Sequence, residues 1–214
     1  MYKRQQLLAP VHGIGITATP TQACLHRDGH GHGICHRFHD LDGELWITEQ
    51  AGAQLLTLHG RTREQGFEGA ADWSAITYVR KALTIPLIAN GDINSPDDAL
   101  RCLDQTGAAG VMVGRGTMGA PWLVGQIDAA LAGRAIPATP NPSARLALAR
   151  DQLDGLVEDR GDHGLLIARK HMGWTCTGFP GASRLRHALM RAPTPALARE
   201  LLTQQIDALA ASAA

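Results

Sequence analysis

The sequence predicts an α/β fold with a parallel sheet, followed by a small all-α helical bundle. Three observations support this prediction. Short apolar runs at residues 54–58, 85–89 and 111–113 each stop at polar or glycine residues, as buried parallel strands do. A pattern with helical spacing follows each run, and repeated β–α units with short connections are typical of a parallel sheet. Beyond a proline-rich stretch, the chain shows helical patterns only.

The composition is that of an ordinary globular protein. The chain has 214 residues, of which 44% are hydrophobic, and its 20 basic side chains balance its 20 acidic ones. The four cysteines show no C-x-x-C spacing, so they indicate neither a disulfide framework nor a zinc ribbon. No apolar run approaches the roughly 20 residues of a membrane helix, and the N-terminus lacks a signal-peptide core. We therefore expect a cytoplasmic protein that has no membrane partner.

Residues 1–48 show neither strand nor helix periodicity and carry six of the ten histidines. We leave this segment unassigned, either as a disordered tail or as the product of translation in a wrong frame upstream of about Glu49. Imidazole and thiolate ligands suit zinc or copper, so a metal site is an alternative. Its ligands would come from Cys24, His26, His30, His32, Cys35 and His36. Because their spacing matches no established template, we expect no metal.

The first two β–α units follow in order from Glu49. Residues 54–58 form the first predicted strand, and Asp72 then has the position of a helix N-cap before apolar residues at helical spacing. Residues 85–89 form the second strand. Ser95 and Pro96 supply an N-cap and a proline at the first helical position, which predicts the second helix.

The third unit completes the β/α segment. Residues 111–113 form its strand, Pro121 opens its helix and Gly133 closes it. Three units cannot close a sheet into a barrel, and a whole (β/α)8 barrel takes roughly 250 residues. We therefore predict that residues 49–135 are the C-terminal part of a (β/α)8 TIM barrel.

A polar or glycine motif follows each of the three strands, and such strand ends are where sites form in these folds. The candidate binding residues are His59, Asn90, Gly91, Asp92, Gly114 and Arg115. Glycines let backbone N–H groups approach a phosphate, and an arginine adds a charged donor. Each motif also has a structural interpretation: turn geometry, a surface ion pair, a structural histidine or an Asx turn.

Residues 136–142 are proline-rich and uncharged, which is typical of a linker between domains. Residues 143–214 then predict a helical domain, whose first helix we expect Ser143 to cap. Further helices are expected near residues 165–175 and 183–191, and a last one from Thr194 onward.

A basic segment lies within this helical domain. No acidic residue occurs from His163 to Arg199, whereas the same stretch contains Arg169, Lys170, Arg184, Arg186, Arg191 and Arg199. Trp174 and Phe179 lie among them. The segment predicts either an RNA-binding face, with aromatic side chains available for stacking, or a solvated basic face with Trp174 in the bundle core.

Four motifs together resemble one family. They are HGRTR at 59–63, IPLIANGDI at 85–93, GAAGVMVGRG at 107–116 and GAPW at 119–122. In order and spacing they are similar to those of the tRNA-dihydrouridine synthases of the bacterial B type, from about Glu49 to the C-terminus. The resemblance implies reduction of a tRNA uridine to 5,6-dihydrouridine, with flavin mononucleotide (FMN) as cofactor, NADPH as reductant and tRNA as partner. It implies no protein partner.

The resemblance also implies residue roles. The residues that it implies to bind FMN are His59, Asn90, Gly91, Asp92, Gly114 and Arg115. The residues that it implies to contact tRNA are Arg61, Arg63, Arg169, Lys170 and His171. The family's catalytic cysteine motif is not legible in this chain, so no catalytic residue is assigned, and neither Cys24 nor Cys35 has the neighbours of that motif.

Two alternatives stay open at this point. In the first alternative, the chain is an inactive truncated product that retains RNA binding through residues 143–214. In the second, it is another phosphate-binding barrel oxidoreductase, which acts on a small metabolite. The long segment without acidic residues argues against the second alternative.

Overall fold

The computed structural model describes residues 13–17, 26–27, 33–34, 53–62 and 65–212. The chain divides into two compact units. The first comprises Met1–Gly116 with Ile127–Ala135, and the second comprises Thr117–Gln126 with Ile136–Ala214. The domain boundaries expected from the sequence stay a prediction.

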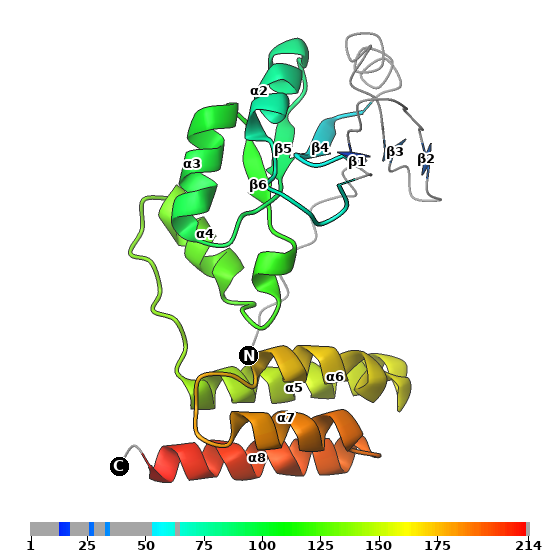
Figure 1. Ribbon diagram of the computed structural model, residues 1–214, viewed down its shortest axis with the longest axis vertical. Helices are drawn as coiled ribbons and strands as arrows, with labels where there is room; N and C mark the ends of the chain where they lie inside the picture. Colours follow the sequence, from blue (N-terminus) through cyan, green and yellow to red (C-terminus); the bar gives the residue numbers. More distant parts are fainter. Residues whose placement is uncertain (1–12, 18–25, 28–32, 35–52, 63–64, 213–214) are drawn as a thin grey trace. The chain divides into compact units, whose positions relative to one another are not determined.

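The first unit contains a parallel sheet of four strands (Figure 1). In spatial order these are β1 (Gly13–Thr17), β4 (Leu55–His59), β5 (Leu87–Asn90) and β6 (Gly110–Met112). Alternate residues of the two central strands, including Leu56, Leu58 and Leu87, are fully buried. The three strands predicted after Glu49 are therefore confirmed, and their parallel pairing gives the α/β class.

Each of these three strands leads into a helix. The helices are α2 (Trp73–Ala82), α3 (Pro96–Thr106) and α4 (Leu123–Leu131). The predicted caps are confirmed, because the Asp72 side chain accepts hydrogen bonds from the N–H groups of Ser74 and Ala75, and Ser95 accepts one from Asp98. Helices α2 and α3 pack on each other and on β5, as Figure 1 shows.

The described residues before Glu49 form three short strands. Besides β1, these are β2 (His26–Arg27) and β3 (Gly33–Ile34), which pair antiparallel. The expectation of no regular structure is wrong at these strands. Strand β1 pairs in parallel with β4 along its whole length, and local sequence periodicity does not reveal such long-range pairing. Most of the histidines and cysteines of the alternative metal site lie outside the described residues.

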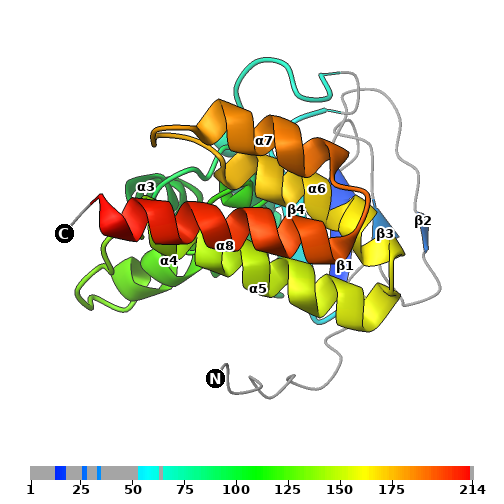
Figure 2. The same ribbon diagram turned by 90° about the horizontal axis from the view of Figure 1, so that it is seen from below.

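The second unit is built on four helices: α5 (Pro142–Arg160), α6 (His163–Thr175), α7 (Ala182–Arg191) and α8 (Pro195–Ala211). Helix α5 packs against α6 and α8, and α7 packs against the same two helices (Figure 2). Buried residues such as Leu146, Leu153 and Leu189 fill the space between them. The predicted helical bundle is confirmed.

One predicted cap is wrong. Helix α5 begins at Pro142, and its cap is Asn141 rather than Ser143, because the Asn141 side chain accepts a hydrogen bond of 2.9 Å from the Ala144 N–H. Thr194 caps α8 as expected. No helix in the described ranges is long and apolar enough to cross a membrane.

Candidate functional site

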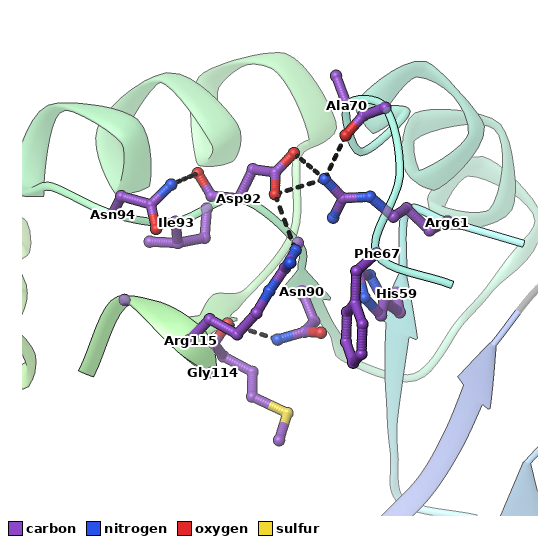
Figure 3. A pocket seen from close by; sticks show the side chains of 14 residues that line it. His59, Arg61, Phe67, Ala70, Asn90, Asp92, Ile93, Asn94, Gly114 and Arg115 are labelled. Carbon is purple, nitrogen blue, oxygen red and sulfur yellow. Dashed lines mark hydrogen bonds and ion pairs between the residues drawn. The ribbon is translucent and has the colours of Figure 1, made fainter. Parts of the chain in front are cut away.

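A pocket of about 640 Å³ opens at the carboxyl ends of β4, β5 and β6. The strand register places His59 beside Asn90 and Asn90 beside Met112, so one residue from each strand lies in a single row. All six predicted binding residues line this pocket: His59, Asn90, Gly91, Asp92, Gly114 and Arg115. Figure 3 shows the side chains of His59, Asn90, Asp92 and Arg115 at this pocket.

Asn90 and Gly91 are fixed by neighbouring backbone groups. The Asn90 side-chain amide donates to the Met112 carbonyl at 2.7 Å, and the Trp73 indole N–H donates to the Gly91 carbonyl at 3.0 Å. Gly91 has φ 126°, and a Cβ there would lie 2.7 Å from the Ala71 Cβ and 3.0 Å from His59 Nδ1. The fold alone therefore requires glycine at position 91.

At Gly114, unlike at Gly91, protein packing does not explain the glycine. It lines the pocket, yet a Cβ built there would meet no protein atom within 4 Å. Packing inside the described protein does not require glycine at this position. A ligand that approaches the backbone closely would require it, as expected for a glycine in a phosphate-binding turn.

The His59 imidazole lines the pocket. Its Nδ1 atom is buried and has no hydrogen-bond partner among the described residues. Burial lowers the pKa of His59 below its ordinary value of 6.5, and the positive charges of Arg61 and Arg115 add to this effect. The lowered pKa favours the neutral ring, which can donate one hydrogen bond and accept another.

Arg61 and Asp92 form a buried ion pair beside the pocket. The Arg61 Nη2 atom lies 2.7 Å from both carboxylate oxygens of Asp92, and the Arg61 side chain is only 3% exposed. Burial alone would raise the pKa of Asp92, but the Ala71 N–H, the Arg61 guanidinium and the charge of Arg115 outweigh it and hold that pKa below its ordinary value.

Arg115 is the accessible cation of the pocket. Its side chain is 43% exposed, and its Nη2 atom lies 3.6 Å from the Asp92 carboxylate. Its guanidinium carbon stacks over the Phe67 ring at 4.8 Å from the centroid. Sequence reasoning missed Phe67, which is 76% exposed; the available signal was an aromatic residue in the glycine-containing loop between β4 and α2.

The residues predicted to contact RNA fall into different environments. Arg61 is buried, because Asp92 and two backbone carbonyls bind its guanidinium, and its contact with tRNA stays a prediction. Arg63 lies outside the described residues. On α6, the Arg169 guanidinium donates to the Ala192 carbonyl at 2.9 Å, whereas Lys170 is exposed.

Two aromatic residues of the bundle have structural partners. The Trp174 ring meets His171 edge to face at 5.2 Å between centroids, and Phe179 packs against the hydrophobic core of the bundle. Burial lowers the pKa of His171, and the charge of Lys170 adds to this. Phe179 and Trp174 are both half-buried.

The two cysteines in the described part of the chain are unsuited to acid catalysis. Cys102 and Cys176 are both buried, and burial raises the pKa of each thiol to about 11. Neither lines the pocket. Cys24 and Cys35 lie outside the described residues.

The family model described as "Dihydrouridine synthase (Dus)" matches residues 45–211. The chain is 46% identical to a probable tRNA-dihydrouridine synthase 1 of Synechocystis, over 78% of this chain and 48% of that one. It is 48% identical to a probable tRNA-dihydrouridine synthase of Rhodobacter capsulatus, over 72% and 47%. It is 39% identical to tRNA-dihydrouridine synthase B of Xanthomonas axonopodis, over 77% and 50%.

The chain belongs to the dihydrouridine synthase family, because the family model covers most of its length. The predicted fold class, the C-terminal part of a TIM barrel followed by a helical bundle, is confirmed by this match and by the parallel sheet. The chain spans about half the length of the curated relatives that it matches.

Proposed function

We propose that this chain carries the phosphate side of the FMN site of a tRNA-dihydrouridine synthase, together with a helical bundle that holds tRNA. One observation carries this proposal. In a chain of this family, His59 and Asn90 end two adjacent parallel strands, Arg115 lies just beyond the third, and all three residues line one pocket. The names of the relatives support a reaction on tRNA, and a tRNA substrate supports a cytoplasmic location.

The residues fit a flavin phosphate in three respects. Arg115 offers an accessible positive charge, as a phosphate requires. At Gly114, no atom of the described residues lies within 4 Å of the position that a Cβ would take. The buried Nδ1 atom of His59 has no partner in the described part of the chain, so a ligand group would satisfy it.

The chemistry that FMN supplies when bound is hydride transfer to the C5–C6 double bond of uridine, with NADPH as the reductant. The residues of this chain bind and orient. Arg115 would hold the phosphate beside Gly114, and the Asn90 side-chain amide is fixed at the edge of the site by its hydrogen bond to the Met112 carbonyl. The uridine leaves its stack to reach the pocket.

The second unit supplies a surface for tRNA. Lys170, Arg184, Arg186 and Arg191 are all exposed on α6 and α7. Arg186 lies over Gly173 of α6, so its charge is close to the helix that carries Lys170. Exposed lysines and arginines on adjacent helices neutralise phosphates and release counterions.

The test is a titration of the purified chain with FMN, followed by quenching of flavin fluorescence. We expect saturable binding, and Arg115→Ala should weaken it at least about tenfold because a charge-assisted phosphate contact is lost. Arg134→Ala is the matched control, since Arg134 is exposed, pairs with Asp128 and does not line the pocket. Unchanged affinity in Arg115→Ala would refute the assignment. A chain that binds tRNA but no FMN would support an inactive RNA-binding product instead.

A further inference from the structure

Three charged side chains meet at one wall of the pocket. Arg61, Asp92 and Arg115 lie side by side in Figure 3, and together they carry a net charge of about +1 at neutral pH. Asp92 is 29% exposed and holds its negative charge, because its pKa is depressed. An unpaired carboxylate at this place would repel a phosphate and would compete for Arg115.

The distances show which arginine neutralises Asp92. Arg61 Nη2 lies 2.7 Å from both carboxylate oxygens, whereas Arg115 Nη2 lies 3.6 Å from the nearer one. Arg61 is held in this place by two further hydrogen bonds, to the carbonyls of Glu68 at 3.2 Å and Gly69 at 2.7 Å. Arg61 therefore makes the shorter ion pair with Asp92, and Arg115 makes the longer one while its side chain stays 43% exposed.

We propose that Arg61 is a positioning residue that neutralises Asp92 and so leaves Arg115 free to bind a phosphate. The inference rests on the proposed function only for the identity of that phosphate as the one in FMN. It replaces the expected role of Arg61 in contacting RNA. A charge of about +1 at the wall, set by three residues, then determines the preference for a phosphorylated ligand.

The same pair also fixes the loop between β4 and α2. Arg61 binds the carbonyls of Glu68 and Gly69, and the Asp92 carboxylate accepts a hydrogen bond of 2.7 Å from the Ala71 N–H. This loop carries Phe67, on which Arg115 stacks. If Arg61 has a purely structural role, it affects ligand binding by holding the loop. If its charge matters, it affects ligand binding by neutralising Asp92. The two roles predict different behaviour in a double variant.

The test compares the unmodified chain with Arg61→Met, Asp92→Asn and the double variant. For each, dissociation constants are measured for FMN, for riboflavin, which lacks the phosphate, and for inorganic pyrophosphate. Arg61→Met leaves Asp92 unpaired beside Arg115. It should weaken FMN and pyrophosphate binding about tenfold or more, while riboflavin binding changes less than about threefold. The double variant has the original net charge, so it should recover FMN binding to within about threefold.

Other results would overturn the inference. A double variant as weak as Arg61→Met, or a parallel loss of FMN and riboflavin binding, would mean that Arg61 acts only through the loop. If the unmodified chain binds pyrophosphate but not FMN, the proposed function fails, and the pyrophosphate series still decides the role of Arg61. If it binds neither, both proposals fail.

A second variant covers the case in which Arg61→Met does not fold. Arg61→Lys keeps the positive charge but loses the two-pronged guanidinium. We expect it to retain the preference for FMN over riboflavin to within about threefold, since the charge that neutralises Asp92 remains. Loss of that preference in a folded Arg61→Lys protein would contradict the proposal.

Discussion

Gly119 packs directly on the backbone of Trp174. A Cβ at Gly119 would lie 2.7 Å from the Trp174 carbonyl oxygen and 2.9 Å from its carbonyl carbon. Gly119 also has φ 75°, in the left-handed region that favours glycine. The GAPW motif of residues 119–122 is thereby fixed to α6 within the second unit, so this glycine serves packing rather than a ligand.

Gly119→Ala should therefore destabilise the protein. The added methyl group meets backbone that cannot move aside, and the residue is strained, so we expect a loss of about 2–4 kcal/mol in the free energy of unfolding. Chemical denaturation measures it. Gly155→Ala is the matched control: Gly155 is exposed in α5 with no protein atom near its Cβ position, and alanine should stabilise the helix by about 0.5–1 kcal/mol. Equal stabilities of the two variants would contradict the packing argument.

Gly114→Ala should separate ligand binding from stability. No protein atom lies within 4 Å of the added Cβ, so the unfolding free energy should stay within about 0.5 kcal/mol of the unmodified value. FMN affinity should fall about tenfold or more, because the methyl group occupies space beside the phosphate. Calorimetric titration and denaturation of the same sample provide both values. Retained affinity would show that Gly114 does not contact the ligand.

Asp92→Asn should change the response to acid. The folded-state pKa of Asp92 is below its ordinary value of 3.8, so the charged form favours the folded state. Its stabilising contribution is fully present above pH 3.8 and is lost as the pH falls through the lower folded pKa. Unfolding free energies measured at about pH 6 and about pH 3 should differ less in Asp92→Asn than in the unmodified chain. Identical pH dependence in both proteins would contradict this assignment.

Reversing the charge of an exposed basic residue on the bundle should weaken tRNA binding, because each such residue is expected to contact a phosphate. Lys170→Glu and Arg186→Glu should each reduce tRNA affinity several-fold and lower the salt-dependence slope by about 1. Gel shifts over a series of salt concentrations measure both quantities. Arg160→Glu is the control, because Arg160 is exposed at the end of α5 and pairs with the adjacent Asp159. An equal effect of all three variants would indicate a general charge effect without a defined surface.

Local chemistry accounts for the parts of the fold that the sequence predicts well. The caps Asp72, Ser95 and Thr194 bind N–H groups two or three residues ahead, so the signal is contained in a short window. The prediction of Ser143 as a cap is wrong because Asn141, two residues earlier, is also a good cap. Pro142 is favoured at the first helical position, which places the cap at Asn141.

Long-range partners account for the parts that it predicts poorly. The burial of Arg61 depends on Asp92, which is 31 residues away, and no local pattern shows whether an arginine after a strand faces outward or inward. The place of Phe67 depends on Arg115 from a different β–α unit. His59, Asn90 and Met112 lie in one row because of the order and register of their strands. The sequence motifs show only that each residue lies near the end of its strand.

The most direct test of the central claim is the location of FMN on the chain. Backbone amide chemical shifts measured during titration with FMN report which residues lie near the ligand. We expect the shift changes to concentrate at Gly91, Gly114 and Arg115, with the Gly155 amide of the second unit unaffected. Binding that shifts only amides outside the pocket, or the absence of any shift at saturating FMN, would contradict the assignment of this pocket as the phosphate side of a flavin site.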